Sequence, residues 1–291
     1  PGKRQYPISF VGTVVPIPPS PEIYQGRGVF PVEARPAMEV QYFRGFPVLV
    51  LQLFPVEYDF SDGGLYFYRK MIIEPDTGAD GRGNEFFSNL PEEREIIASQ
   101  VDNPEMAASF AGMAATLPGV LELEPGAVDY VIVTRAALKD GFAPLLALRQ
   151  QQGWKTKLVT MEEILPGFAG RDDAEKLRNF VKAAYQAWGT RHLLLAGDAD
   201  TRSTNGENEP VVVPCRLLRA LGEEGMKGNI PGDQYFGCLD GDYDANGNHV
   251  FGETMDGAGG GDVDLLAEVY VGRAPVDKPE EVANFVKKVV A

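Results

Sequence analysis

The run Tyr130-Val131-Ile132-Val133-Thr134 decides the fold class, because a short apolar run bounded by polar residues is typical of a strand buried on both faces. A helical stretch follows from about Ala136 to Gln152 and ends at Gly153. The segment Lys157-Leu158-Val159 is predicted to be the next strand. This alternation predicts an α/β fold, a mostly parallel sheet with helices on both faces.

The same alternation continues towards the C-terminus. A second helix is predicted from Asp172 to Trp188, with Gly189 as its stop, and His192-Leu193-Leu194-Leu195-Ala196 is predicted to be a central parallel strand. Further strands are predicted at residues 210–218, 234–239 and 267–272, and a final helix at Lys278-Pro279-Glu280-Glu281 with Asp277 as its cap. The sequence stops inside that helix, so we expect a fragment or a processed chain.

The N-terminal part has a different pattern. Residues 46–53 and 65–73 are predicted strands, joined through a connection that contains the turn signal Asp62-Gly63. Pro91-Glu92-Glu93 is a helix opening, and residues 74–126 are otherwise predicted to be connection with one or two short helices. The sequence therefore predicts a smaller antiparallel β domain with a connecting helix at residues 1–125 and an α/β domain at residues 126–291.

Composition excludes some partners. The 291 residues carry 27 basic and 42 acidic side chains, a net charge of -15, which argues against a nucleic acid or an anionic membrane held by a basic surface. No stretch reaches ~18 apolar residues, so no membrane span is predicted. Residues 228–272 contain no Lys or Arg but nine Asp and Glu, so more than half of the net charge lies in one segment that is suited to a cation.

The most specific motif is the loop from Asp242 to Glu253. It matches the calcium-loop template, in which oxygen ligands at alternate positions surround a hard cation and a glycine at the sixth position permits the sharp turn. A polar turn without an ion is the alternative. The predicted ligands are Asp242, Asp244, Asn246, Asn248 and Glu253, and possible additional ligands are Asp233, Asp240, Asp262 and Asp264.

Cysteine and histidine give weaker signals. Cys215 and Cys238 are too few for a disulfide scaffold, and two separate buried thiols are favoured over a single bridge. His192 begins an apolar strand and is interpreted as structural, whereas His249 lies in the cation loop and is expected to point outward. Asp198, at the carboxyl end of a strand, either contacts a ligand or caps a turn, and the turn is favoured.

Three motifs in order carry a resemblance to a known family. They are the strand and turn at residues 193–198, the segment Gly232-Asp233-Gln234-Tyr235-Phe236-Gly237-Cys238-Leu239-Asp240-Gly241-Asp242, and Ala267-Glu268-Val269-Tyr270-Val271-Gly272-Arg273-Ala274-Pro275. Together they resemble the gingipain-type cysteine peptidases, which have a caspase-like fold. Residues 1–75 are similar to the β-rich prosegment of that family, with residues 43–45 and 54–58 as the matching stretch.

The resemblance implies the N-terminal part, proregion and first catalytic subdomain, of a secreted or cell-surface cysteine endopeptidase that hydrolyses peptide bonds. The family places its histidine and nucleophilic cysteine in the second subdomain, and no residue here matches them, so no catalytic residue is carried over. Structural calcium at the Asp242–Glu253 loop is implied, as is an anchoring role for Arg273 at the sheet edge. Arg44 and Lys70 are candidates for a prosegment residue that blocks the active site.

The expected partners are the remainder of the catalytic domain and protein or peptide substrates. The alternative hypothesis is a non-catalytic, calcium-stabilised extracellular module for binding or scaffolding. The two hypotheses differ in whether a His-Gly and a nucleophilic Cys follow in the parent gene.

Overall fold

The structure, a computed structural model, describes two compact units of the chain. One unit comprises residues 1–39 and 49–80, and the other comprises residues 40–48 and 81–291. The described residues are 28–31, 37–74, 84, 86–88, 90–111, 123–124, 126–200, 210–219, 229–253, 255–257 and 262–290.

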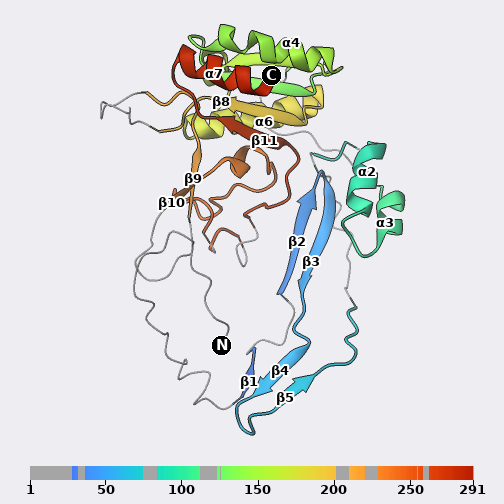
Figure 1. Ribbon diagram of the computed structural model, residues 1–291. Helices are drawn as coiled ribbons and strands as arrows, with labels where there is room; N and C mark the ends of the chain where they lie inside the picture. The colour runs from blue at the N-terminus through green and yellow to red at the C-terminus, as the bar shows by residue number, and fades with distance from the viewer. Residues whose placement is uncertain are drawn as a thin grey trace. The chain divides into compact units, whose positions relative to one another are not determined.

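The larger unit is built on a four-stranded sheet in the order β11-β8-β6-β7, and all three neighbouring pairs are parallel. Figure 1 labels β8 and β11 of this sheet. Val131 pairs with Leu193 on one side and Lys157 on the other, which makes the run at residues 130–134 a central strand. The four strands are β6 (Tyr130–Thr134), β7 (Thr156–Thr160), β8 (His192–Ala196) and β11 (Tyr270–Ala274).

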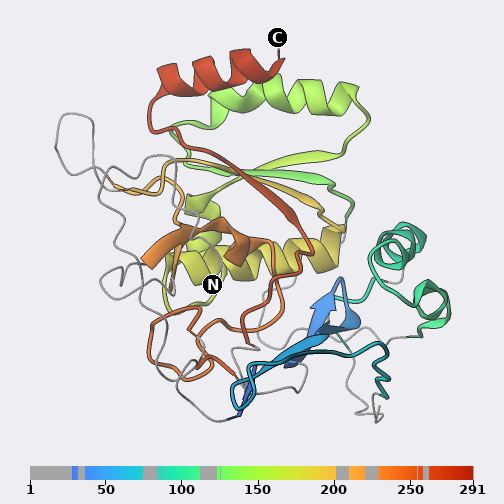
Figure 2. The same ribbon diagram turned by 60° about the horizontal axis from the view of Figure 1, so that its bottom comes forward.

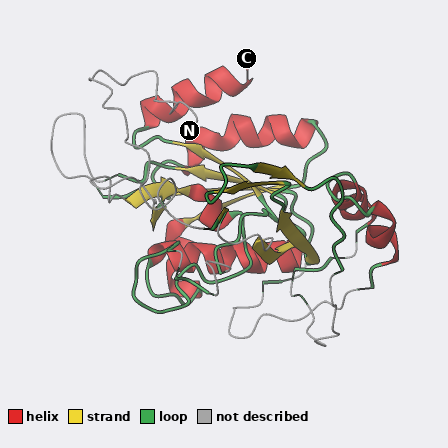
Figure 3. Ribbon diagram, turned by 90° about the horizontal axis from the view of Figure 1, so that it is seen from below, coloured by secondary structure: helices red, strands yellow, loops and turns green. Residues whose placement is uncertain are grey.

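Helices cover both faces of this sheet, as Figures 2 and 3 show. The helices α4 (Ala143–Gln151) and α7 (Pro279–Val290) pack together on one face, and α6 (Asp173–Trp188), with α5 (Met161–Gly167) against it, lies on the other. Asp172 caps α6 by accepting from the Glu175 N–H at 2.9 Å, and Gly189 ends it in the left-handed conformation. The predicted α/β fold with a parallel sheet is confirmed.

Several predicted boundaries were wrong. Residues 234–239 are not a strand, because the 3-10 helix η2 (Asp233–Phe236) buries Tyr235 and Phe236. The helix expected from Ala136 begins instead as the 3-10 helix η1 (Lys139–Phe142), and α4 starts at Ala143. The last predicted strand begins at Tyr270 rather than 267. Each of these segments has the expected apolar residues, but tertiary packing decides the backbone conformation.

The predicted strand at residues 210–218 forms only at its end, where β9 (Arg216–Arg219) pairs antiparallel with β10 (Asn229–Gly232). The carbonyls of the preceding residues bind arginine instead. Arg135 donates to Val211 and Val212, and Arg273 donates to Val213 and Pro214.

In the smaller unit, β1 (Val29–Phe30), β4 (Val56–Asp59) and β5 (Leu65–Phe67) form an antiparallel sheet in the order β1-β4-β5. The expected turn at Asp62-Gly63 joins β4 to β5, and the Gly64 N–H donates to Asp62 Oδ1. The strand predicted at residues 65–73 is shorter than expected, because β5 ends at Phe67. The strand expected at residues 46–53 is β3 (Phe46–Gln52), which pairs with β2 (Ala37–Phe43).

The turn between β2 and β3 belongs to the larger unit. Its residues Phe43 and Phe46 are buried in a small core with Phe87, Ile97 and Ala107. The short helices α2 (Pro91–Ala98) and α3 (Pro104–Ser109) supply part of this core, as the helix opening at Pro91 predicts. Among the described residues, no helix has the length and apolar character needed to cross a bilayer.

Candidate metal centre

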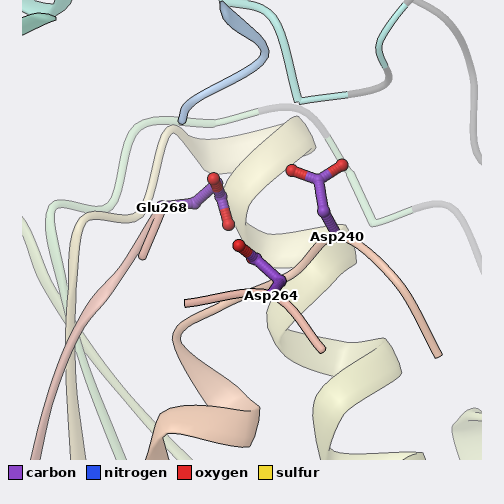
Figure 4. A group of neighbouring side chains, drawn as sticks. All are labelled: Asp240, Asp264 and Glu268. Carbon is purple, nitrogen blue, oxygen red and sulfur yellow. The ribbon is translucent and has the colours of Figure 1, made fainter. Parts of the chain in front are cut away.

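Three carboxylates converge in the larger unit, on the loops between η2 and β11 (Figure 4). One oxygen from each of Asp240, Asp264 and Glu268 lies within 4.8 Å of the others. Asp240 follows η2, and Glu268 stands two residues before β11. The fold therefore brings together acidic residues that are up to 28 positions apart in the sequence.

Glu268 is fully buried, and both of its carboxylate oxygens are held by backbone groups. Oε1 accepts from the Arg44 N–H at 2.9 Å, and Oε2 accepts from the Leu239 N–H at 2.8 Å. Burial raises the pKa of Glu268 well above its ordinary value, and the negative charges of Asp240 and Asp264 raise it further. An added positive charge would relieve both effects.

Asp264 is also buried, and only one of its oxygens is engaged. Oδ1 accepts from the Leu266 N–H at 2.9 Å, and among the described residues no hydrogen-bond donor reaches the buried Oδ2. Burial raises the pKa of Asp264 to about 7. A buried carboxylate oxygen that accepts no hydrogen bond is unfavourable, so this atom indicates a missing positive partner.

The backbone around Asp240 is fixed by an arginine of α6. The Arg178 guanidinium donates to the carbonyls of Cys238, Asp240 and Gly241 at 2.8–2.9 Å. The Asp240 side chain accepts from Asn84 Nδ2 at 3.2 Å. Asp240 is thus held beside Asp264 and Glu268 by contacts from elsewhere in the same unit.

These three residues fit a hard divalent cation. All the donors are carboxylate oxygens, which suit Ca²⁺, Mg²⁺ or Mn²⁺ and do not suit soft metals. Two of the acids are deeply buried and hold protons more tightly than usual, as expected when the countercharge is absent. The cluster is therefore able to bind a metal.

The predicted calcium loop is placed differently. Asp242 and Asp244 converge on the Arg171 guanidinium, which bonds Asp244 Oδ2 through Nη1 at 2.8 Å and Asp242 Oδ1 through Nη2. The Asp244 carboxylate is fully buried. Arg171 therefore supplies the positive charge at the first and third positions of the loop.

The remaining predicted ligands bond within the loop. Asn246 Oδ1 accepts from the Asn248 N–H at 2.9 Å, and Asn248 Nδ2 donates to Glu253 Oε2 at 2.7 Å. Gly247 has a positive φ, as the template requires. Asp242, Asp244 and Glu253 do not form a three-carboxylate group in this fully described loop. Calcium binding there stays a prediction.

Of the possible additional ligands, Asp264 and Asp240 lie in the acidic cluster, and the others are engaged elsewhere. Asp262 Oδ1 accepts from the Asp242 N–H, and Asp233 is paired with Arg273. Sequence reasoning missed Glu268 as a ligand and counted it only as a negative charge. An acid two residues before the apolar strand β11 was the signal that could have found it.

Arg273 anchors the sheet edge, as the motif comparison implies. Its guanidinium makes two hydrogen bonds of 2.7 Å to Asp233 and donates to the carbonyls of Gly197, Val213 and Pro214. All of its N–H groups are used in this way, so one side chain connects three loops near the carboxyl ends of the strands.

Asp198, at the carboxyl end of β8, accepts from the Ala199 N–H at 2.6 Å and the Asp200 N–H at 3.2 Å. It caps a turn, which is the interpretation that the sequence favoured.

The cysteines and histidines have structural surroundings. Cys215 and Cys238 are both free thiols. Burial raises the pKa of Cys238 to about 12 and also raises the pKa of Cys215. A reactive cysteine needs a lowered pKa, so neither residue has the character of a nucleophile. His192 stacks on Tyr270 and packs against Trp154, and the His249 side chain is 70% exposed, as expected.

The parallel sheet covered by helices on both faces places this chain among α/β proteins. The profile of Peptidase family C25 matches residues 123–291. The chain therefore belongs to peptidase family C25, the gingipain family of cysteine peptidases. No curated protein matches the sequence.

Two solved structures are similar to parts of the chain. Dimeric latent PorU from Porphyromonas gingivalis has 21% identity and a TM-score of 0.41, and the match covers 56% of this chain and 15% of that one. A structure described only as a protease has 23% identity and a TM-score of 0.32, with 60% of this chain and 29% of that one covered. This chain thus spans a small part of either protein.

Proposed function

We propose that residues 126–291 are the first subdomain of a caspase-like catalytic domain in a cysteine endopeptidase. Residues 1–125 are its β-rich prosegment. The observation that carries this proposal is the match of residues 123–291 to peptidase family C25. The helix-covered parallel sheet is the scaffold that such a subdomain needs, and Arg273 orders loops at the edge where open α/β sheets bind ligands.

The reaction of this family is attack by a cysteine thiolate on a peptide carbonyl, with a histidine moving the proton. Neither cysteine matches the family's nucleophile motif, and burial raises the pKa of both thiols. The proposal therefore places the nucleophile and its histidine outside residues 1–291. The partners are the rest of the catalytic domain and protein substrates, and the protein acts outside the cell or at its surface. Arg44, a candidate for blocking the active site, is buried at the N-terminal end of β11, over the Tyr270 ring.

We also propose that calcium stabilises this subdomain. The acidic cluster of Asp240, Asp264 and Glu268 holds one ion, and a second ion at the Asp242–Glu253 loop would displace Arg171 from Asp242 and Asp244. The ions hold the long irregular connection between η2 and β11 in place. The reactive groups of the peptidase are separate from both sites.

Peptide hydrolysis tests the peptidase assignment. The 291-residue chain is expected to be inactive, and the same chain extended by the sequence that follows it in the gene is expected to cleave peptides in a thiol-dependent manner. An extension that lacks a His-Gly and a nucleophilic Cys, or an active 291-residue chain, would contradict the proposal. In the first case the non-catalytic, calcium-stabilised module becomes the better assignment.

A further inference from the structure

The turn between β2 and β3 reaches the acidic cluster through its backbone. Arg44 has a φ of 50° and Gly45 a φ of 80°, and both residues are buried. This left-handed geometry directs the Arg44 N–H to Glu268 Oε1 at 2.9 Å, across 224 residues of sequence. A residue near the N-terminus thus holds a ligand of the cluster near the C-terminus.

The turn is closely packed where it makes this contact. A Cβ at Gly45 would lie 2.4 Å from Phe87 Cα, so only glycine fits. Phe43 and Phe46, on either side, are buried with Phe87. Apolar packing therefore contributes to holding the Arg44 N–H in position, together with the bond to Glu268.

The Arg44 side chain is directed elsewhere. Its Nη1 lies 3.9 Å from Glu93 Oε1, and the guanidinium carbon lies 5.3 Å from the Tyr270 ring centroid. The turn gives Glu268 a neutral N–H donor, and the Leu239 N–H holds the other oxygen at 2.8 Å. A neutral donor favours the ionised carboxylate and orients it, yet does not repel a cation as a guanidinium bonded to it would.

We propose that the turn at Phe43–Phe46 is a positioning element of the cation centre, and that docking of this turn and binding of the cation stabilise each other through Glu268. The proposal rests on the proposed metal centre. The turn and the centre are then coupled, because the cation binds more tightly to the state in which the docked turn orients Glu268. By linkage, docking of the turn increases the affinity for the cation by the same factor by which the cation increases the equilibrium constant for docking. Such factors are roughly 5- to 150-fold.

Calorimetric titration of the 291-residue chain with Ca²⁺ tests the proposal. Gly45→Ala removes the turn geometry, and its matched control is Gly63→Ala, because Gly63 also has a positive φ, 70°, but its Cβ would lie no closer than 3.8 Å to Tyr58 Oη. We expect Gly45→Ala to weaken calcium binding at least fivefold and Gly63→Ala to leave the affinity unchanged. Equal affinity in Gly45→Ala and the parent chain overturns the proposal.

Hydrogen exchange of the unsubstituted chain supplies a second test if Gly45→Ala does not fold. Calcium is expected to slow exchange of the Arg44 amide more than that of the amides at Asp62–Gly64. Unchanged protection of Arg44 in saturating calcium overturns the coupling and leaves the metal centre intact. The absence of calcium binding in the unsubstituted chain refutes the metal centre, and the coupling with it.

Discussion

Replacement of Asp264 by asparagine isolates the charge of the acidic cluster. The substitution keeps an oxygen in place of Oδ1, which accepts from the Leu266 N–H at 2.9 Å. It replaces the buried Oδ2, which has no donor among the described residues, by an amide that can donate to Asp240 or Glu268. The variant is therefore nearly isosteric and removes one of three crowded negative charges.

The magnitude follows from the raised pKa of Asp264. The ordinary pKa of this carboxyl is 3.8, and burial raises it to about 7. Between these values the unfolded chain has lost the proton that the folded chain still holds, so rising pH destabilises the folded state. At pH 8 and without a metal, the full difference between the two pKa values lowers the free energy of unfolding of the parent chain by roughly 4 kcal/mol. The asparagine side chain of the variant does not titrate and does not incur this penalty.

Urea denaturation from pH 4 to pH 8 in chelator measures the effect. We expect the free energy of unfolding of Asp264→Asn to rise relative to that of the parent chain by up to ~4 kcal/mol across this range. Calcium at 100 times its Kd should stabilise the parent chain by about 2.7 kcal/mol and the variant much less. Asp102→Asn, at an exposed site, is the control and should follow the parent. A difference that does not grow with pH, or an equal calcium effect in both chains, would refute the reasoning.

Three further predictions concern other side chains. Arg273→Lys loses the paired bonds to Asp233 and the contacts to the carbonyls of two further segments, and should lower the free energy of unfolding in urea by ~2–3 kcal/mol; a loss under ~0.5 kcal/mol would show that the anchor is dispensable. Arg171→Gln leaves the buried Asp244 carboxylate without its guanidinium partner, and should destabilise the chain by ~1–3 kcal/mol in chelator and by less in calcium; the same loss in both conditions argues against calcium in the Asp242–Glu253 loop. Cys238, with its pKa at about 12, should resist iodoacetamide in the native chain at pH 8 and react after denaturation, as followed by mass spectrometry; fast native labelling would contradict its burial.

The order of strands and helices in the α/β unit could be predicted because it is local. The apolar runs at residues 130–134 and 192–196 are long enough to identify buried strands, and Asp172 and Gly189 mark the ends of α6 by their own conformational preferences. The segment at residues 210–218 could not be predicted in the same way. Its carbonyls bind Arg135 and Arg273, which are distant in the sequence.

The candidate site shows the same limit. The loop template identified residues that are close in the sequence, whereas the acidic cluster joins Asp240 to Asp264 and Glu268 across the connection between η2 and β11. Its buried, unpaired oxygen is a property of the folded state alone. Arg171 could not be assigned to the loop either, because no local spacing relates it to Asp242 and Asp244.

The bond between Arg44 and Glu268 also imposes an order on biosynthesis. The two residues are 224 positions apart, so at ~5–20 residues per second the ribosome needs roughly 10–45 s to deliver the acceptor after the donor. During that interval Phe43 and Phe46 can already pack against Phe87, Ile97 and Ala107, which are synthesised long before Glu268. The turn can therefore be packed early in synthesis, whereas its Arg44 N–H has no acceptor at Glu268 until residue 268 has emerged.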